Sequence, residues 1–189
     1  MRRGYTKQAY LDLVSKIRET VPAVHFTSDF IFGFCGETDA DHAQTMDLID
    51  DVKYNFLYMF AYSMREKTHA QHNLQDDVPQ QVKVARVDEA NRLFRKHALE
   101  YNQSLVGSTQ LVLVEGPSRR SEKDYAGRND ANVRVVFPHE VVSDSDGNTA
   151  LPKEGDYLSV SIVSATSQSL RARPLHLTSI TEFNRERIQ

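Results

Sequence analysis

Two carboxylates and two glycines lie close together in residues 28–38, where an apolar run becomes polar. Asp29 lies inside the apolar run, and Glu37 follows Gly33 and Gly36. The pattern predicts a strand that ends in a glycine turn and leads directly into a helix. Backbone N–H groups at such a turn bind anionic or polar groups, and glycines let a ligand come close. We therefore expect a cofactor site at the carboxyl end of this strand.

Both acids also have a purely structural interpretation. Burial of an unpaired charge is costly, so an acid in an apolar strand needs hydrogen bonds or a ligand. Asp29 could pair with an Arg or Lys of the fold, and Glu37 could be the negative charge at a helix N-terminus. The residues alone leave both interpretations open.

A second polar group, residues 62–68, follows the next apolar run. The planar fork of Arg65 suits a carboxylate or a phosphate. Ser63 and Thr68 either contact a ligand or shape a turn, and Tyr62 either stacks on a base or packs in the core. If the two runs are neighbouring strands of a barrel, their carboxyl ends face one site.

Cysteine and histidine offer little metal chemistry. Cys35 is the only cysteine, which excludes an internal disulfide and an iron–sulfur cluster ligated by this chain alone. A lone cysteine is more often inert than reactive. His69 and His72 lie in a polar connector that supplies no converging set of ligands, so we expect them to be solvated.

A basic cluster marks the last part of the sequence. The net charge of -3 and the pI near 6.2 give no overall signal for nucleic acid, so any RNA-binding face must be local. Interspersed acids leave a solvated surface as the alternative. The cluster, with one neighbouring amide, consists of Arg119, Arg120, Lys123, Arg128, Asn129, Arg134 and Arg171.

The strand-end groups must be positioned by helices and strands in alternation. Thr6 is a good N-cap for a helix over residues 6–20. Residues 24–32 are nearly continuously apolar, which predicts a strand buried on both faces, and residues 54–62 predict the next strand. A capping-box pattern begins the helix between them, at residues 38–51. The order predicts part of a parallel α/β sheet or barrel. The inward side chains expected in the second helix are Ala43, Met46 and Ile49.

The rest of the chain predicts a long helix and then a β-rich region. Residues 71–77 are a polar connector, and residues 79–102 form an amphipathic helix, interpreted as a linker helix or, alternatively, as a coiled-coil partner. Its inward stripe is Val84, Val87, Ala90, Phe94, Ala98 and Tyr101. Short strands separated by turns then predict a small antiparallel barrel. They cover residues 111–114, 133–137, 157–163 and 175–180.

No segment suggests a membrane or a targeting role. The 40% hydrophobic content supports a packed core, yet no apolar run approaches the length that spans a bilayer. The N-terminus lacks the pattern of a secretory signal or of an Arg- and Ser-rich transit peptide.

Four segments resemble those of the radical S-adenosylmethionine methylthiotransferases, which add a methylthio group to adenosine in tRNA. Residues 28–38 (SDFIFGFCGET) resemble the family pattern (S/T)-D-x-I-x-G-F-P-G-E-T, and residues 60–70 (FAYSMREKTHA) resemble Y-S-x-R-x-G-T-x-A. Residues 1–6 (MRRGYT) are similar to M-x-R-G-Y-[ST]. Residues 111–116 (LVLVEG), followed by residues 127–129 (GRN), resemble the start of the family's TRAM domain.

The resemblance implies a fold of the α/β class. Residues 1–75 would be the C-terminal part of a radical S-adenosylmethionine (β/α) barrel, and residues 76–105 a linker helix. Residues 106–182 would be a small antiparallel, OB-like TRAM β-barrel. The chain would be the C-terminal part of a longer protein.

The resemblance also implies cofactors. They are S-adenosylmethionine and 4Fe-4S clusters, and the cysteine motifs that ligate those clusters are missing from this sequence. We therefore expect the chain alone to be inactive, with no catalytic and no metal-binding residue of its own. The implied cofactor-binding residues are Ser28, Asp29, Gly33, Phe34, Gly36, Glu37, Tyr62, Ser63 and Arg65, and the basic cluster would bind RNA.

Three departures from the family patterns leave local geometry open. Cys35 replaces a proline and Lys67 a glycine, as in the eukaryotic, mitochondrial branch. The family's C-terminal Leu-x-Gly corresponds here to residues 170–172 (LRA), so the turn at that point could differ.

The implied function of the complete protein is methylthiolation of isopentenyladenosine beside the anticodon, with the tRNA anticodon stem-loop as partner. The implied location is mitochondrial, with the cytoplasm as a second location, and a cyclin-dependent kinase activator is a further implied partner. One alternative is a non-catalytic RNA-binding or regulatory truncated isoform. The other is a sibling methylthiotransferase that acts on threonylcarbamoyladenosine or on a ribosomal protein aspartate.

Overall fold

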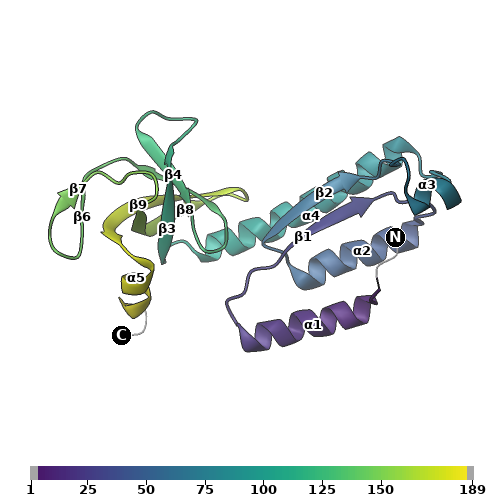
Figure 1. Ribbon diagram of the computed structural model, residues 1–189, viewed down its shortest axis with the longest axis horizontal. Coiled ribbons are helices and arrows are strands. Elements are labelled where there is room, and N and C mark those ends of the chain that lie inside the picture. Colours follow the sequence, from purple (N-terminus) through teal and green to yellow (C-terminus); the bar gives the residue numbers. More distant parts are fainter. Residues whose placement is uncertain (1–3, 187–189) are drawn as a thin grey trace. The chain divides into compact units, whose positions relative to one another are not determined.

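A computed structural model describes residues 4–186, and Figure 1 shows the order of the helices and strands. The first three residues of the family-like segment at residues 1–6 lie outside the described part. The chain divides into two compact units, Met1–His97 and Ala98–Gln189. Along residues 4–186, no helix is both long and apolar enough to cross a membrane.

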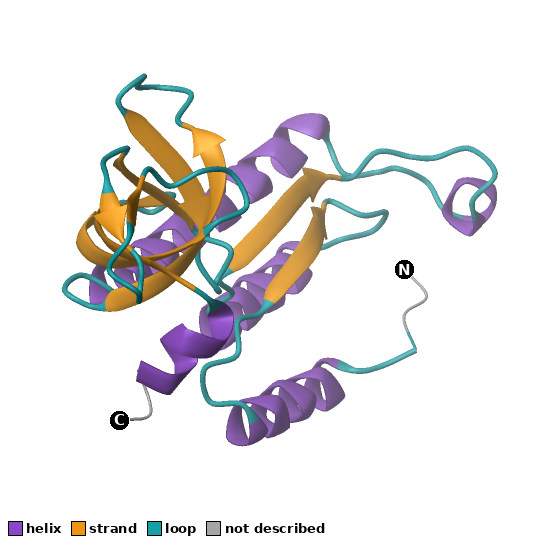
Figure 2. Ribbon diagram, turned by 60° about the vertical axis from the view of Figure 1, so that its left-hand side comes forward, coloured by secondary structure: helices purple, strands orange, loops and turns teal. Residues whose placement is uncertain are grey.

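The first unit is a parallel strand–helix–strand arrangement with further helices. Its elements are α1 (Lys7–Thr20), β1 (Thr27–Phe32), α2 (Asp39–Val52), β2 (Phe56–Ala61), α3 (His69–Asn73) and α4 (Gln80–Ser104), of which residues 98–104 belong to the second unit. β1 and β2 pair in parallel, from Thr27 opposite Phe56 to Phe32 opposite Ala61 (Figure 2). The expected alternation of helices and strands over residues 6–62 is thus confirmed.

Local hydrogen bonds begin the first two long helices where the sequence predicts. The Thr6 hydroxyl accepts a hydrogen bond from the Ala9 backbone N–H at 3.2 Å. At α2, Thr38 Oγ1 accepts from the Asp41 backbone N–H at 3.2 Å, and the Asp41 carboxylate accepts from the Thr38 backbone N–H at 2.9 Å. This reciprocal pair is a complete capping box.

The core of the first unit lies on one face of the two strands. It consists of Val14, Phe32, Ile49, Val52, Tyr54, Leu57 and Ala90. The opposite face carries Asp29, Ile31, Tyr58 and Phe60, and the three apolar side chains are 38%, 55% and 52% exposed. The prediction that the first strand is buried on both faces is therefore wrong for the described residues. Apolar composition alone does not reveal whether a second layer covers a strand.

Two expected inward positions point outward instead. Ala43 and Val84 are exposed, whereas His42, Lys83 and Arg86 are buried. Long basic side chains bury their aliphatic stems while their charged ends pair with acids. A pattern of apolar residues therefore does not reveal that Lys83 and Arg86 face inward. The sequence did not predict the helix α3, because residues 69–73 (HAQHN) are short and hold a single apolar residue, Ala70.

The second unit is a closed five-stranded β-barrel. Its strands are β3 (Thr109–Pro117), β4 (Asp124–Arg128), β5 (Arg134–Pro138), β8 (Tyr157–Ala165) and β9 (Ser169–Thr178), with the short β6 (Val142–Ser143) and β7 (Thr149–Ala150) and the helix α5 (Ile180–Glu186). The barrel order is β5–β4–β3–β8–β9, and a parallel pairing of β5 with β9 closes it. The expected small barrel is confirmed, with antiparallel pairing everywhere except at this closure and in the single-pair contact of β6 with β9.

Alternating side chains fill the barrel. The buried members are Val112, Val114, Val135, Phe137, Val142, Leu158, Val160, Ile162, Leu170 and Ala172. The sequence of β4, Asp-Tyr-Ala-Gly-Arg, does not predict a strand, because Asp and Gly are rare in strands. Gly127 is required there, since a Cβ would lie 2.6 Å from Val112 Cγ1. The last strand begins at Ser169 rather than at residue 175, so residues 170–172 are strand and not a turn.

Candidate functional site

The turn after β1 is built around the Glu37 carboxylate. Glu37 Oε2 accepts hydrogen bonds from the backbone N–H groups of Gly33 at 2.7 Å and Phe34 at 3.2 Å. Gly33 adopts a left-handed φ of 75° in this turn. The carboxylate thus occupies the N–H groups that an anionic ligand would otherwise use, and it fixes the direction in which Phe34 leaves the strand.

Arg86 of α4 completes this arrangement. Its Nη1 lies 2.9 Å from Glu37 Oε1 and its Nη2 lies 2.7 Å from Asp39 Oδ1. The Arg86 side chain is 7% exposed, so the guanidinium is committed to the two acids. Glu37 therefore positions the turn in this structure, and its direct contact with a cofactor stays a prediction.

A lysine with its own acid lies beside the same turn. Lys83 Nζ lies 2.5 Å from Asp76 Oδ1 and 5.3 Å from the centre of the Tyr62 ring. The pKa of the Tyr62 phenol is raised by partial desolvation and by a hydrogen bond with Cys35. The Tyr62 hydroxyl donates a hydrogen bond to Met64 Sδ at 3.3 Å, and Cys35 is half-buried.

A pocket of about 410 Å³, which we call the strand-end pocket, opens at the carboxyl ends of β1 and β2. Phe34 and Tyr62 form its aromatic wall, with ring centres 4.9 Å apart in an edge-to-face arrangement. Its full lining is Phe34, Tyr62, Arg65, Thr68, His69, Ala70 and Leu74. An apolar wall with one guanidinium at hand suits a flat aromatic group that carries a carboxylate or a phosphate.

The structure brings three of the nine predicted cofactor residues together in this strand-end pocket, namely Phe34, Tyr62 and Arg65. Ser28 and Asp29 lie on opposite faces of β1, because successive strand residues alternate, and Asp29 is exposed. The structural interpretation of Asp29 requires an ion pair with an Arg or Lys, and Asp29 forms no such pair among the described residues.

The remaining predicted residues lie around the pocket. Gly33 and Glu37 shape the turn, and Gly36 donates its backbone N–H to Asp77 Oδ1 at 2.7 Å. Ser63 is exposed and does not line the pocket. Sequence reasoning missed the acids and bases that hold the turn, which are Asp76, Asp77, Lys83 and Arg86. They come from the segment and helix that follow β2, and their polar context gave no signal of burial.

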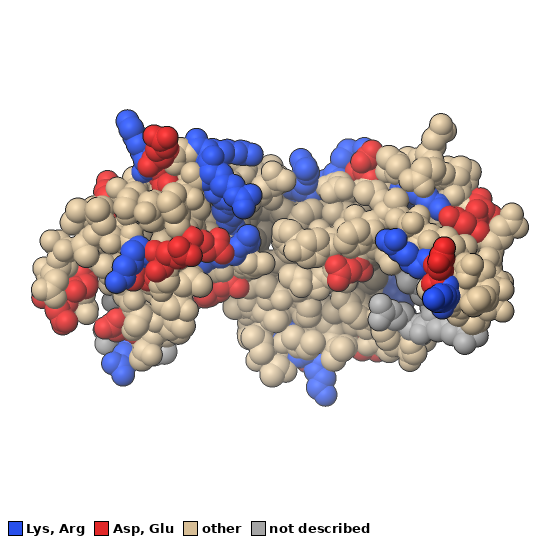
Figure 3. Space-filling model, turned by 45° about the horizontal axis from the view of Figure 1, so that its top comes forward, with Lys and Arg blue, Asp and Glu red and all other residues tan. Residues whose placement is uncertain are grey.

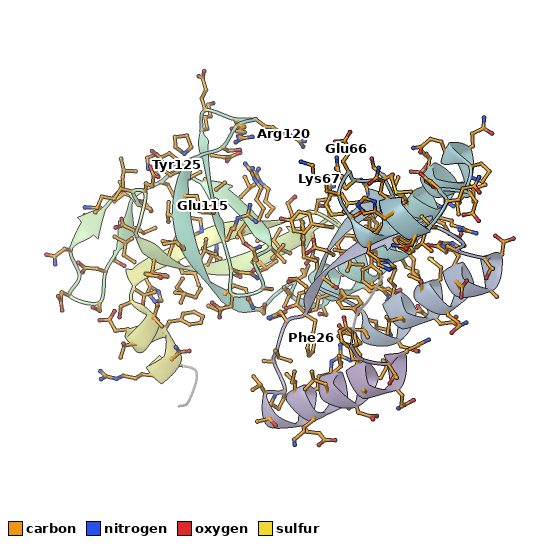
Figure 4. All side chains as sticks on the ribbon, turned by 45° about the vertical axis from the view of Figure 1, so that its right-hand side comes forward. Phe26, Glu66, Lys67, Glu115, Arg120 and Tyr125 are labelled. Carbon is orange, nitrogen blue, oxygen red and sulfur yellow. The ribbon has the colours of Figure 1, made fainter. Side chains whose placement is uncertain are left out.

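The second unit carries a separate basic site. Four members of the basic cluster, from three segments, line one hollow of about 640 Å³, and they are Arg119, Arg120, Arg134 and Arg171. Lys and Arg gather over one region of this unit, with acids close by (Figure 3). Arg120 extends from the loop between β3 and β4 (Figure 4). We call the concavity lined by these four arginines the arginine hollow.

One acid belongs to the arginine hollow. Asp124 forms a bidentate ion pair with Arg171, with both N–O distances at 3.1 Å. The Asp124 side chain is 11% exposed and the Arg171 side chain is 51% exposed. The acid therefore holds the guanidinium from behind while half of the arginine remains open to solvent.

The other three predicted RNA-binding residues lie outside the arginine hollow. Arg128 pairs with Glu115 at 3.1 Å and donates to the Asn132 carbonyl at 2.9 Å. Asn129 is buried and its Oδ1 accepts from the Val133 N–H at 3.0 Å, which closes the loop before β5. Lys123 is exposed.

The described residues do not fit an iron–sulfur cluster. Within residues 4–186, no group of three or more His, Cys, Asp and Glu side chains is placed to hold a metal ion. His69 lines the strand-end pocket instead of joining such a group. The residues do fit part of an S-adenosylmethionine site, since the strand-end pocket offers aromatic walls and Arg65.

The second unit is a closed small β-barrel with a basic face, and residues 103–175 match the family model described as TRAM domain. The chain is 50% identical over 184 residues to "Mitochondrial tRNA methylthiotransferase CDK5RAP1" of Homo sapiens, covering 96% of this chain and 31% of that protein. It is 39% identical over 180 residues to "tRNA-2-methylthio-N(6)-dimethylallyladenosine synthase" of Flavobacterium johnsoniae, covering 95% of this chain and 35% of that protein.

The family resemblance is thereby confirmed: the chain carries a TRAM domain and is related over nearly its whole length to the tRNA methylthiotransferases. A protein of Oryza sativa, "CDK5RAP1-like protein", is 46% identical over 189 residues, with 97% of this chain and 31% of that protein covered. The chain thus spans about a third of the length of the curated relatives it matches.

Proposed function

We propose that the complete protein is a mitochondrial tRNA methylthiotransferase that acts on isopentenyladenosine beside the anticodon. The observation that carries this proposal is the 50% identity, over 96% of the chain, to a protein with that enzyme name. This chain would supply part of the cofactor cleft and the RNA-binding domain. The similarity of bacterial relatives that are named for dimethylallyladenosine favours this substrate over threonylcarbamoyladenosine.

In this proposal, β1 and β2 belong to a radical S-adenosylmethionine barrel. Their exposed face would then line the barrel interior, which gives Ile31, Tyr58 and Phe60 a covered environment and directs Asp29 toward the reaction site. S-adenosylmethionine, when bound with a reduced cluster, supplies the radical and the methyl group. The cluster ligands would come from other parts of the protein.

The strand-end pocket supplies binding and orientation in this proposal. Phe34 and Tyr62 would pack against a flat aromatic group, and Arg65 would bind a carboxylate or a phosphate. Glu37 and Arg86 would hold the turn rigid, because both oxygens of the carboxylate are already bonded. The role of these two residues is thus positioning.

A non-catalytic RNA-binding product remains the second candidate. A product limited to these residues would hold one cysteine, Cys35, and could not ligate a cluster alone. The kinase activator partner is an independent proposal that a pull-down with the complete protein would test.

Nucleoside analysis tests the proposed function. Loss of the gene should abolish methylthio-isopentenyladenosine in mitochondrial tRNA, measured by liquid chromatography and mass spectrometry, and the complete wild-type gene should restore it. Complementation with Arg65→Ala should restore little of it, whereas Arg92→Ala, an exposed change on α4, should restore it fully. Loss of the threonylcarbamoyl form instead, or no loss of either, would refute the assignment.

A further inference from the structure

We infer that the arginine hollow of the TRAM unit is a subsite for one unpaired nucleotide and its adjoining phosphate. The inference rests on the proposed tRNA function and assigns a specific form of RNA to one place on the domain. Four arginines, an apolar floor and a rigid loop meet in this one concavity of about 640 Å³. Cavities of about 300–1,000 Å³ hold ligands of the size of a nucleotide.

The strand pairing that closes the barrel places the basic residues together. β5 and β9 pair in parallel, with Arg134 opposite Ser169 and Val136 opposite Arg171. Because alternate residues of a strand share a face, Arg134 and Val136 point to the same side as Ser169 and Arg171. The hollow thus lies over the closure seam, and its basic groups belong to a rigid part of the barrel.

The charge of the hollow suits few phosphates. Arg134 forms no ion pair with another described residue, whereas Arg171 shares its charge with Asp124. A continuous duplex backbone would bring a second or third phosphate close to the hollow, and the Asp124 carboxylate in its wall would repel them. Asp124 instead fixes the guanidinium plane of Arg171, which leaves one preset donor group for a single phosphate.

The floor and the side wall suit a base and a ribose. Val136 and Ala165, which are half-buried, supply apolar surface within the lining. The loop after β8 is preset by hydrogen bonds, since Thr166 Oγ1 accepts from the Gln168 and Ser169 backbone N–H groups at 3.2 Å and 3.0 Å.

The last turn of α4 also holds this loop. Asn102, which is 2% exposed, donates from Nδ2 to the Thr166 carbonyl at 2.7 Å. A concave wall that is held before binding suits an extruded base, which is the form in which RNA loops are recognised. A stacked base pair in a duplex cannot enter such a hollow.

Binding of RNA to the 189-residue chain tests this inference. Fluorescence anisotropy would compare an anticodon stem-loop, a single strand of the same length and a blunt duplex with the same number of phosphates. The stem-loop and the single strand should bind about tenfold or more tightly than the duplex. Equal affinity for the duplex would overturn the inference.

Variants then locate the site. Arg134→Gln should weaken binding of the stem-loop by about tenfold and lower the salt slope, the change of log K with log salt concentration, by about 0.7, the value for one phosphate on a single strand. Arg173→Gln is the matched control, because Arg173 is exposed on β9 but does not line the hollow. Equal losses in both variants would show diffuse electrostatics and overturn the subsite while RNA binding stands.

Asp124→Asn separates positioning from net charge. If Asp124 only reduces the positive charge, its neutralisation should tighten RNA binding and steepen the salt slope. Because Asp124 orients Arg171, we expect weaker binding instead, with an unchanged melting temperature as the check on folding. Tighter binding would overturn this role of Asp124, and absence of any RNA binding by the wild-type chain would overturn the subsite. The nucleoside analysis on the complete protein would still judge the proposed function independently.

Discussion

Gly33 is the position where a single methyl group should damage the strand-end turn most. A Cβ at Gly33 would collide with Lys83 Cγ and lie 3.1 Å from Lys83 Cδ and 3.2 Å from Lys83 Cβ. These atoms form the stem of a 3% exposed side chain whose Nζ is bound to Asp76, so they cannot swing away freely. Gly33→Ala must therefore displace the lysine, the turn or both.

The magnitude combines two costs. The left-handed φ of 75° costs an alanine about 1–2 kcal/mol, and overpacking of a filled site costs about 1–3 kcal/mol more. Gly36→Ala is the matched control, because Gly36 has a φ of 74° but nothing within 4 Å of its Cβ position. We expect a loss of about 3 kcal/mol in the free energy of unfolding for Gly33→Ala and about 1 kcal/mol for Gly36→Ala.

Urea unfolding followed by far-ultraviolet circular dichroism measures the difference, since α1, α2 and most of α4 belong to the first unit. With a urea dependence of about 2 kcal/mol per molar, the midpoint should fall by about 1.5 M for Gly33→Ala and about 0.5 M for Gly36→Ala. Equal shifts of the urea midpoint in the two variants would refute the reasoning. The loss in both would then come from backbone strain alone, with no contribution from the collision with Lys83.

Three further changes probe the first unit by the same unfolding assay. Arg86→Lys should lower the free energy of unfolding by about 2 kcal/mol, because an ammonium cannot bridge two carboxylates with a planar fork; a neutral result would mean that the bridge is dispensable. Burial, together with the hydrogen bond to Tyr10, raises the pKa of Tyr54, so its contribution is complete below pH 10.0 and is lost as pH rises further. Tyr54→Phe should therefore flatten the loss of stability above about pH 10, and an unchanged alkaline slope would contradict this. Hydrogen bonds from Thr38 lower the pKa of Asp41, so that contribution is present above pH 3.8 and is lost as pH falls through the lowered pKa. Thr38→Val should remove the hydroxyl's larger share of this acid-dependent part and keep the share of the backbone N–H, and persistence of the full wild-type acid profile would count against the role of the hydroxyl.

Features that depend on neighbours in the sequence were predictable. The caps of α1 and α2 need only a hydroxyl and a backbone N–H three residues away, and both are read directly from Thr6 and Thr38. The turn at Gly33 was predictable for the same reason, because a left-handed φ favours glycine. The local spacing of residue types therefore contains this part of the fold.

Features that depend on distant partners were not predictable. Glu37 could have faced a cofactor or a helix dipole, and only the fold shows that Arg86, 49 residues later, binds it. The sequence likewise gave no sign that Arg119 and Arg171 line one hollow while Arg128 does not. Such convergence depends on strand order and register, which periodicity does not encode.

The burial of the basic partner distinguishes the two kinds of ion pair in this chain. Arg86 and Lys83 are 7% and 3% exposed, and their acids occupy their charged ends, so a ligand could reach them only by breaking bonds that hold the turn. Arg171 is 51% exposed while its acid, Asp124, is 11% exposed, which is the opposite arrangement. A buried acid behind an open guanidinium orients the cation without covering it. The ion pairs of Arg86 and Lys83 therefore stabilise the strand-end turn, whereas the Asp124–Arg171 pair presents a positive charge to an anionic partner.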